Sequence, residues 1–177
     1  MNTPSVILRQ WKDSDLTAFA EMNADPEVMR YFVRPRSADE SKTDLARLRS
    51  LIDERGWGLW AMEVDGACAG FTGLSVPNFA AHFTPCVEIG WLLRREFWGR
   101  GIAYAAARQA ETFAFENLKL SALVSFTTAE NHKSRRLMER LGFSHDANED
   151  FLHPQLPESH PLRPHVLYRK NNSGPAQ

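Results

Sequence analysis

A glycine-containing turn stands between an apolar strand and an alanine-rich helix near the middle of the chain. The predicted strand includes 87–93, the turn contains Gly99 and Gly101, and the predicted helix covers 102–117. Glycine lets the backbone approach a ligand closely, and the first N–H groups of a helix have no partner within it. Together with the helix dipole, these N–H groups form a site for an anion, most often a phosphate. The turn therefore indicates a phosphate-bearing ligand, and an ordinary helix start is the alternative.

Two common kinds of nucleotide-binding turn do not fit this segment. A dinucleotide-binding turn needs a third Gly or Ala where this chain has Tyr104, and an acidic residue where the next strand ends in Thr128. A P-loop needs Gly-Lys-Ser/Thr, which the sequence does not contain. A nucleotide-dependent oxidoreductase is therefore disfavoured.

A carboxylate within an apolar strand is the second chemically informative feature. Glu88 lies in the strand predicted over 84–93, on the same face as Cys86 and on the opposite face from Ile89. Burial of a carboxylate is costly without a partner or a task, and it raises the pKa of the group toward neutrality. Glu88 is therefore predicted to be a general base, and an ion pair with an Arg is the alternative. Cys86 would permit a covalent acyl-enzyme route, but no sequence-local His–Asp partnership supports it.

Several short motifs follow one another in a fixed order along the chain. They are Leu8-Arg9 leading into Trp11-Lys-Asp-Ser-Asp15, Glu88-Ile-Gly-Trp, Phe97-Trp-Gly-Arg-Gly-Ile-Ala, Asn131-x-x-Ser134 and Leu141-Gly142-Phe143. In this order and spacing they resemble the GNAT superfamily of acyl-CoA-dependent N-acetyltransferases, in particular its RimJ/RimL-like branch. The resemblance covers roughly residues 5–145.

The resemblance implies an α/β (α+β) fold, the GNAT fold. Its mixed, twisted sheet has six to seven strands flanked by about four helices, and strands four and five splay apart. The pantetheine arm of acetyl-CoA would lie in that gap, and the turn 98–103 would hold the pyrophosphate. The implied cofactor-binding residues are Trp91, Leu92, Leu93, Trp98, Gly99, Arg100, Gly101, Ile102, Ala103 and Asn131.

The resemblance also implies direct attack of an amine on the thioester in a ternary complex, with Glu88 as the base. Many family members protonate the departing thiolate with a Tyr at the position of Met138, and a Met cannot donate a proton. Ser134 is the remaining candidate, directly or through a water molecule, and a Ser bonded back to a helix carbonyl is the alternative. Asn131 is implied to bind the pantetheine arm, and an N-cap role is the alternative or an addition.

The acceptor amine is the least specified part of the prediction. Tyr31, Phe32 and Phe83 are predicted to bind it, because they belong to segments that set acceptor specificity in this fold. An aromatic-lined mouth suits a peptide N-terminus, a lysine-like amine or a small-molecule or antibiotic amine with an apolar body, but it would also suit a subunit interface. A non-catalytic acyl-CoA-binding sensor of the same fold is the alternative function.

Length and composition bound these expectations. A chain of 177 residues suits one domain, predicted over 1–170 with a mobile tail over 171–177. A formal net charge of −1 gives no general attraction to nucleic acid or membrane, and no secretory signal is visible. The isolated Cys68 and Cys86 suggest reduced thiols in a cytoplasmic protein. The protein is expected to be a monomer or a homodimer. The six histidines match no metal signature, so no metal is expected.

The order of the remaining elements supports a mixed sheet. Asp65-Gly66 is a strong signal for a two-residue hairpin turn. Strands are predicted over 5–11, 58–64, 67–76, 84–93, 122–127, 143–151 and 164–170, and helices over 15–23, 37–55, 102–117 and from Asn131 onward, with a loop over 77–83.

Overall fold

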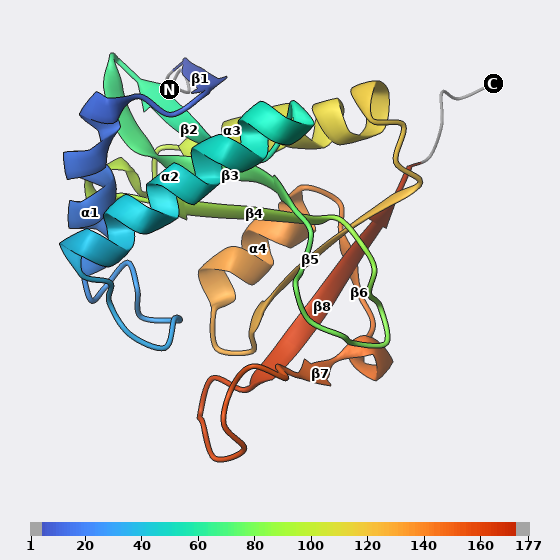
Figure 1. The fold of residues 1–177 in the computed structure, drawn as a ribbon. Helices are drawn as coiled ribbons and strands as arrows, with labels where there is room; N and C mark the ends of the chain where they lie inside the picture. The colour runs from blue at the N-terminus through green and yellow to red at the C-terminus, as the bar shows by residue number, and fades with distance from the viewer. Residues whose placement is uncertain (1–4, 173–177) are drawn as a thin grey trace.

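An open mixed sheet forms the centre of the protein in a computed structural model that describes residues 5–172 (Figure 1). Its strand order is β1-β2-β3-β4-β5-β8-β6, and β7 pairs with β8. Only β4 and β5 are parallel neighbours. The strands are β1 (Val6–Arg9), β2 (Leu59–Val64), β3 (Ala67–Ser75), β4 (Glu88–Leu93), β5 (Ala122–Thr128), β6 (Ser144–His145), β7 (Phe151–Leu152) and β8 (Pro164–Asn171).

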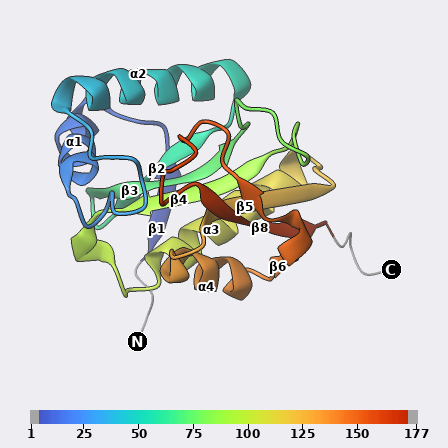
Figure 2. The same ribbon diagram turned by 90° about the horizontal axis from the view of Figure 1, so that it is seen from below.

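Helices cover both faces of this sheet, as Figure 2 shows with α2 above it and α3 and α4 below it. The helices α1 (Leu16–Ala24) and α2 (Ala38–Arg55) pack on one face, in a core that includes Phe19, Leu48 and Ala61. The helices α3 (Ile102–Thr112) and α4 (His132–Arg140) pack on the other face, in a core that includes Ile89 and Leu123. The mixed, two-sided α/β architecture that the resemblance implied is confirmed.

Local sequence signals explain where several elements begin and turn. Ser37 caps α2: its side chain accepts from the Glu40 amide, and Glu40 accepts from the Ser37 amide, which is a capping box. Asp65 and Gly66 connect β2 to β3 with φ of 51° and 79°, the left-handed conformation that a two-residue hairpin turn requires. Both predictions from the sequence, helix and hairpin, are confirmed.

Three predicted elements differ from the observed ones. The strand expected over 84–93 starts only at Glu88, because Pro85 has no N–H to donate to a ladder. The strand expected over 143–151 is split into β6 and β7 by a 3-10 turn, Ala147–Glu149, which the Asp146 side chain caps. The helix expected over 102–117 changes at Phe113 into a π-helical turn, Phe113–Asn117. Eight strands therefore form among the described residues, where six to seven were expected.

The C-terminal end of the described chain belongs to the sheet. The predicted tail over 171–177 overlaps β8, which includes Asn171, and the Asn172 amide donates to the Ser121 carbonyl at 2.8 Å. Residues 173–177 lie outside the described residues, as do 1–4. Within the described range, no helix has the length and apolarity needed to cross a membrane.

The strands β4 and β5 separate just after they meet. They share a single register pair, Glu88 with Val124, and the Val124 amide donates to the Val87 carbonyl at 3.1 Å. One step further, the Ser125 hydroxyl donates to the Ile89 carbonyl at 2.9 Å, so a side chain takes the place of a ladder bond. Beyond this point the two strands no longer pair, which is the splay expected between strands four and five.

Candidate active site

A cavity of about 1030 Å³ opens at the splay between β4 and β5. Its walls come from β3, β4 and β5, from the turn that leads into α3, from α4, and from the segment that follows α1. The cavity thus joins the predicted phosphate-binding turn to the predicted acceptor region. Most of the predicted site residues line it: Tyr31, Phe32, Glu88, Trp91, Leu92, Leu93, Trp98, Gly99, Gly101, Ile102, Ala103, Asn131 and Ser134.

Strand alternation assigns the cavity walls to opposite faces of the sheet. Ile89 packs against α3 and α4, whereas Leu92, which shares its parity with Glu88, packs against the α1 and α2 core. Glu88 therefore belongs to the α1/α2 face, and Ser134 on α4 lies on the other. Groups from both faces, Glu88 from one and Ser134 from the other, can reach a ligand that lies in the gap between β4 and β5.

Glu88 is half-buried, and its carboxyl group has one hydrogen-bond partner within residues 5–172. The Ser75 hydroxyl, which is directly opposite in the β3–β4 register, donates to its Oε2 at 3.2 Å. Burial raises the pKa of Glu88 to about 8, and the hydrogen bond from Ser75 lowers it only in part. Within residues 5–172 Glu88 forms no ion pair, so the alternative of an Arg-paired scaffold Glu is not observed. The arrangement provides a proton acceptor that functions near neutral to mildly alkaline pH.

The side chain of Asn131 caps α4, and Ser134 lines the cavity. Asn131 Oδ1 accepts from the Ser134 amide at 3.3 Å, and its Nδ2 donates to the Thr127 hydroxyl at 3.1 Å. The N-cap alternative is therefore confirmed for Asn131. No hydrogen bond from the Ser134 hydroxyl to another described group is found, so the back-bonded alternative is not observed. Met138 is 1% exposed in the core and offers no proton donor.

The turn that enters α3 leaves backbone donors uncapped. Gly99 and Gly101 have φ of 72° and 75°, and no side chain caps the first turn of α3. The Trp98 indole donates to the Leu93 carbonyl at 3.0 Å, which fixes the turn against the end of β4. Such a helix start attracts an anion through its N–H groups and its dipole.

Arg100 is placed differently from the prediction. It does not line the cavity; its guanidinium lies 3.8 Å from Asp65 and stacks on the Phe97 ring at 5.4 Å. The turn therefore directs this cation toward the β2–β3 hairpin, away from the cavity.

The backbone of β4 presents only alternate residues to the gap. The Arg94 amide donates to the Ala69 carbonyl of β3. The backbone groups of an antiparallel strand point alternately toward and away from its neighbour, so the backbone of Leu92, two residues before Arg94, also points toward β3. Trp91 and Leu93 face the β5 side, and the Leu93 carbonyl is already taken by Trp98. This corrects the prediction for Leu92, which contributes its side chain to the cavity wall but not its backbone. Trp91 is the residue whose backbone faces the open gap.

A row of cations on α4 was missed from the sequence. Lys133, Arg136 and Arg140 are spaced three and four residues apart, so they share a helix face, and all three line the cavity. Lys133 lies 4.2 Å from the centre of the Trp98 ring, and Arg140 lies 4.7 Å from that of Tyr104. None forms an ion pair within residues 5–172. Their common spacing was the available signal, and their position beside the turn suits further phosphate groups.

The acceptor side contains some of the predicted aromatic residues and some others. Tyr31 and Phe32 line the cavity as predicted. Phe83 does not: it is 7% exposed and packs with Val124 and Leu167, because the 77–83 loop folds onto the sheet. Phe71 and Phe126 line the cavity instead. Both lie in predicted strands, and neither was among the predicted acceptor residues.

Cys86 is a poor candidate for a covalent intermediate. It packs beside the cluster around Phe83 and does not line the cavity. Burial, together with the neighbouring Glu88, raises the pKa of its thiol to about 11. The thiolate is the reactive form of cysteine, and little of it exists near neutral pH. Within residues 5–172, no group of three or more His, Cys, Asp or Glu is placed to hold a metal ion.

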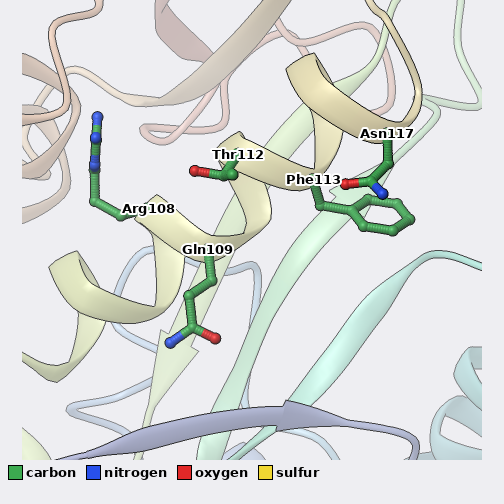
Figure 3. A pocket seen from close by; sticks show the side chains of 5 residues that line it. All are labelled: Arg108, Gln109, Thr112, Phe113 and Asn117. Atoms are coloured by element: carbon green, nitrogen blue, oxygen red, sulfur yellow. The ribbon is translucent and has the colours of Figure 1, made fainter.

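A shallower depression of about 480 Å³ lies along α3 (Figure 3). Its polar side chains are used within the protein: Gln109 donates to the Val6 carbonyl at 3.0 Å, and Arg108 pairs with Glu111 at 2.9 Å. Figure 3 shows Arg108 pointing away from Phe113 and Asn117, so the polar groups do not converge on one point. This depression is not a candidate site.

Comparisons with known proteins agree with this geometry. The family model described as "Acetyltransferase (GNAT) domain" matches residues 5–144, so the chain belongs to the GNAT acetyltransferase family. The spermidine N(1)-acetyltransferase of Escherichia coli K12 is 30% identical over 141 residues, which cover 79% of this chain and 73% of that protein. A crystal structure of an acetyltransferase from Agrobacterium tumefaciens C58 matches with a TM-score of 0.75 at 28% identity, covering 97% of this chain and 93% of that one.

One similar protein is considerably longer than the matched region. The FsC-acetyl coenzyme A-N(2)-transacetylase of Aspergillus fumigatus Af293 is 31% identical over 132 residues, which are 71% of this chain. The match spans only 56% of the fungal protein.

Proposed function

We propose that the protein transfers the acetyl group of acetyl-CoA to a primary amine by direct attack in a ternary complex. The observation that carries this proposal is the position of Glu88. It is a half-buried carboxyl group with a pKa raised to about 8, at the single register pair between β4 and β5, and it lines the cavity that includes the phosphate-type turn. A base near the amine is needed because a protonated amine has no lone pair with which to attack.

The residues of the cavity account for each part of that reaction. The turn 98–103 and the α4 cations would hold the phosphates, and the Trp91 backbone would bond a pantetheine amide in the gap. The amine gives a proton to Glu88, its nitrogen forms the new C–N bond, and the C–S bond breaks. The CoA thiolate leaves and takes a proton through the Ser134 hydroxyl or a water that Ser134 orients, and the second proton of the reacting nitrogen replaces the proton given up. The products are the amide and free CoA.

A turnover screen tests the proposal directly. The protein is incubated with acetyl-CoA and a panel of amines, amino acids and peptides, and the released thiol is measured. Release of CoA that depends on the amine, together with the acetylated product by mass spectrometry, is the expected result. Binding of acetyl-CoA without release of thiol for any amine would favour the second candidate, a non-catalytic acyl-CoA sensor. Met138, which occupies the core where a proton donor would stand, is the observation that favours it.

We expect Ser134→Ala to slow turnover and to leave the affinity for acetyl-CoA within a few-fold of wild type. A lost general acid typically lowers the rate by ~10²–10⁴, and a water molecule recovers part of this. Single-turnover kinetics and a binding titration separate the two quantities. Ser134→Thr, which keeps a hydroxyl, is the matched control. An unchanged chemical step in Ser134→Ala would remove this residue from the mechanism.

We expect Ser75→Ala to shift the pH dependence of turnover to higher pH. The hydroxyl of Ser75 donates to the carboxylate of Glu88 and lowers its pKa, so its removal leaves the pKa of Glu88 higher still. The rate should then level off at a higher pH than in wild type, and Ser75→Thr should restore the profile. A deficit of equal size at every pH would instead indicate that Ser75 acts only on packing.

A further inference from the structure

The acceptor side of the cavity has few charged groups. Among the described residues, its charged side chains on the α1/α2 face are Glu88, which is half-buried, and Glu27 and Arg30, which are both exposed. The pKa of Glu88, raised to about 8, keeps much of this carboxyl neutral near pH 7. A second positive charge on an acceptor would therefore meet only the exposed Glu27 as a fixed counter-charge.

The one cation at this rim has no acidic partner. Arg30 stacks on the Tyr31 ring at 5.8 Å and forms no ion pair within residues 5–172. Its neighbours in sequence are different: Arg34 pairs with Glu40 at 2.6 Å, and Arg36 pairs with Asp44 at 2.8 Å. Arg30 therefore repels a second cation that reaches the rim of the cavity.

Aromatic rings form most of the remaining acceptor wall. Phe126 is held in place by contacts with Phe83 and Phe151 at ring-centre distances of 5.8 and 5.5 Å. Phe32 also lines the cavity and is 46% exposed, although it is a large apolar residue. A cavity wall that combines fixed rings with an exposed ring suits a flat apolar group.

We infer that the acceptor is a monoamine on an aromatic body, bound against the cavity-lining rings of Phe126 and Phe32 with its amine at Glu88, and not a polyamine. The inference rests on the proposed function and narrows its substrate. A polyamine is the informative comparison, because one relative is a spermidine acetyltransferase. A polyamine would have to place its distal ammonium groups among apolar rings and beside Arg30, and an unpaired charge there is unfavourable.

The test is a comparison of kcat/KM at saturating acetyl-CoA for 2-phenylethylamine, ethylamine and spermidine. We expect 2-phenylethylamine to exceed each of the other two by about tenfold or more, since a filled apolar pocket discriminates by about that factor. Phe32→Ala should lower the value for 2-phenylethylamine several-fold and leave acetyl-CoA affinity unchanged. Val33→Ala, at an exposed neighbour outside the cavity, is the matched control.

A charge reversal at Arg30 supplies an independent measurement. Arg30→Glu should improve kcat/KM for spermidine and change that for ethylamine little, whereas Arg30→Gln should give an intermediate value. Spermidine used as well as or better than 2-phenylethylamine by the wild type would overturn the inference and leave the proposed function standing. Acetyl-CoA binding without turnover of any of the amines would contradict the proposed function itself, and the acceptor assignment with it.

Discussion

Replacement of Glu88 by Gln is expected to lower the rate of acetyl transfer near pH 8 by about 10²-fold or more. Gln keeps the size of the side chain and can still accept the Ser75 hydrogen bond, but it cannot take up a proton. The affinity for acetyl-CoA should be nearly unchanged, because the phosphate-type turn is a separate part of the cavity. Glu54→Gln, at an exposed position on α2, is the control for a change of one charge.

The pH profile identifies the role of Glu88 more sharply than the rate alone. Since its pKa is about 8, the wild-type rate should rise with pH and level off above about pH 8. The Gln variant depends on amine that is already neutral, so its rate should keep rising toward the pKa of the amine. The deficit should therefore shrink above pH 8. A deficit that is independent of pH would argue for a structural role.

The stability of the same variant has a definite sign. The pKa of Glu88 is raised on folding, so between about pH 4.5 and pH 8 the folded protein holds a proton that the unfolded chain has lost. The free energy of unfolding therefore falls as pH rises through this window and is constant above it. Glu88→Gln removes the ionisable group that causes this pH-dependent fall in the free energy of unfolding. At pH 8 and above, the variant should therefore be at least as stable as wild type in thermal unfolding.

The second large effect is expected for Gly101→Asp, which should abolish stabilisation by acetyl-CoA. At 100-fold excess over its dissociation constant, a ligand that binds only the native state adds about 2.7 kcal/mol. Gly101 immediately precedes α3, so a carboxylate there would face the bound phosphates at the uncapped helix start. Thermal unfolding with and without acetyl-CoA measures the effect.

A matched variant separates charge from backbone strain at this position. Gly101 has φ of 75°, so any side chain there is strained, by about 1–2 kcal/mol, and both variants should unfold earlier without ligand. Gly101→Asn has the size of Asp without its charge, and Asn tolerates this conformation comparatively well. It should therefore retain part of the acetyl-CoA shift. A wild-type shift in Gly101→Asp would show that the phosphate assignment is wrong.

The parts of the site that could be predicted are those written in short contiguous motifs. The glycines of the turn, Glu88 in its apolar strand and Asn131 at a helix start each carry a local signal, and the structure places all of them in one cavity. Helix α2 and the Asp65-Gly66 hairpin were predictable for the same reason, because a capping box and a two-residue turn each depend on only a few neighbouring residues.

The parts that failed depend on partners distant in sequence. Ser75 acquires its role only because the β3–β4 register sets it opposite Glu88. Leu92 was assigned to the cofactor together with its neighbours Trp91 and Leu93, but strand alternation turns the backbone of Leu92 toward β3. Phe83 is buried and Phe126 lines the cavity, because the fold of the 77–83 loop decides which ring is covered. The spacing of Lys133, Arg136 and Arg140 places them on one helix face, but whether that face, or the side chain of Arg100, lies at the cavity depends on tertiary packing.

The separation of β4 from β5 also sets a limit on how this protein can be stabilised. Across that seam the two halves of the sheet are joined by one register pair and the Ser125 hydroxyl. Substitutions that paired β4 with β5 along their whole length would add backbone hydrogen bonds, but they would close the proposed binding gap. A ligand bound in this gap would itself bridge the two strands. Between β4 and β5, substitutions that raise the stability of the ligand-free protein are therefore expected to weaken ligand binding, and the reverse.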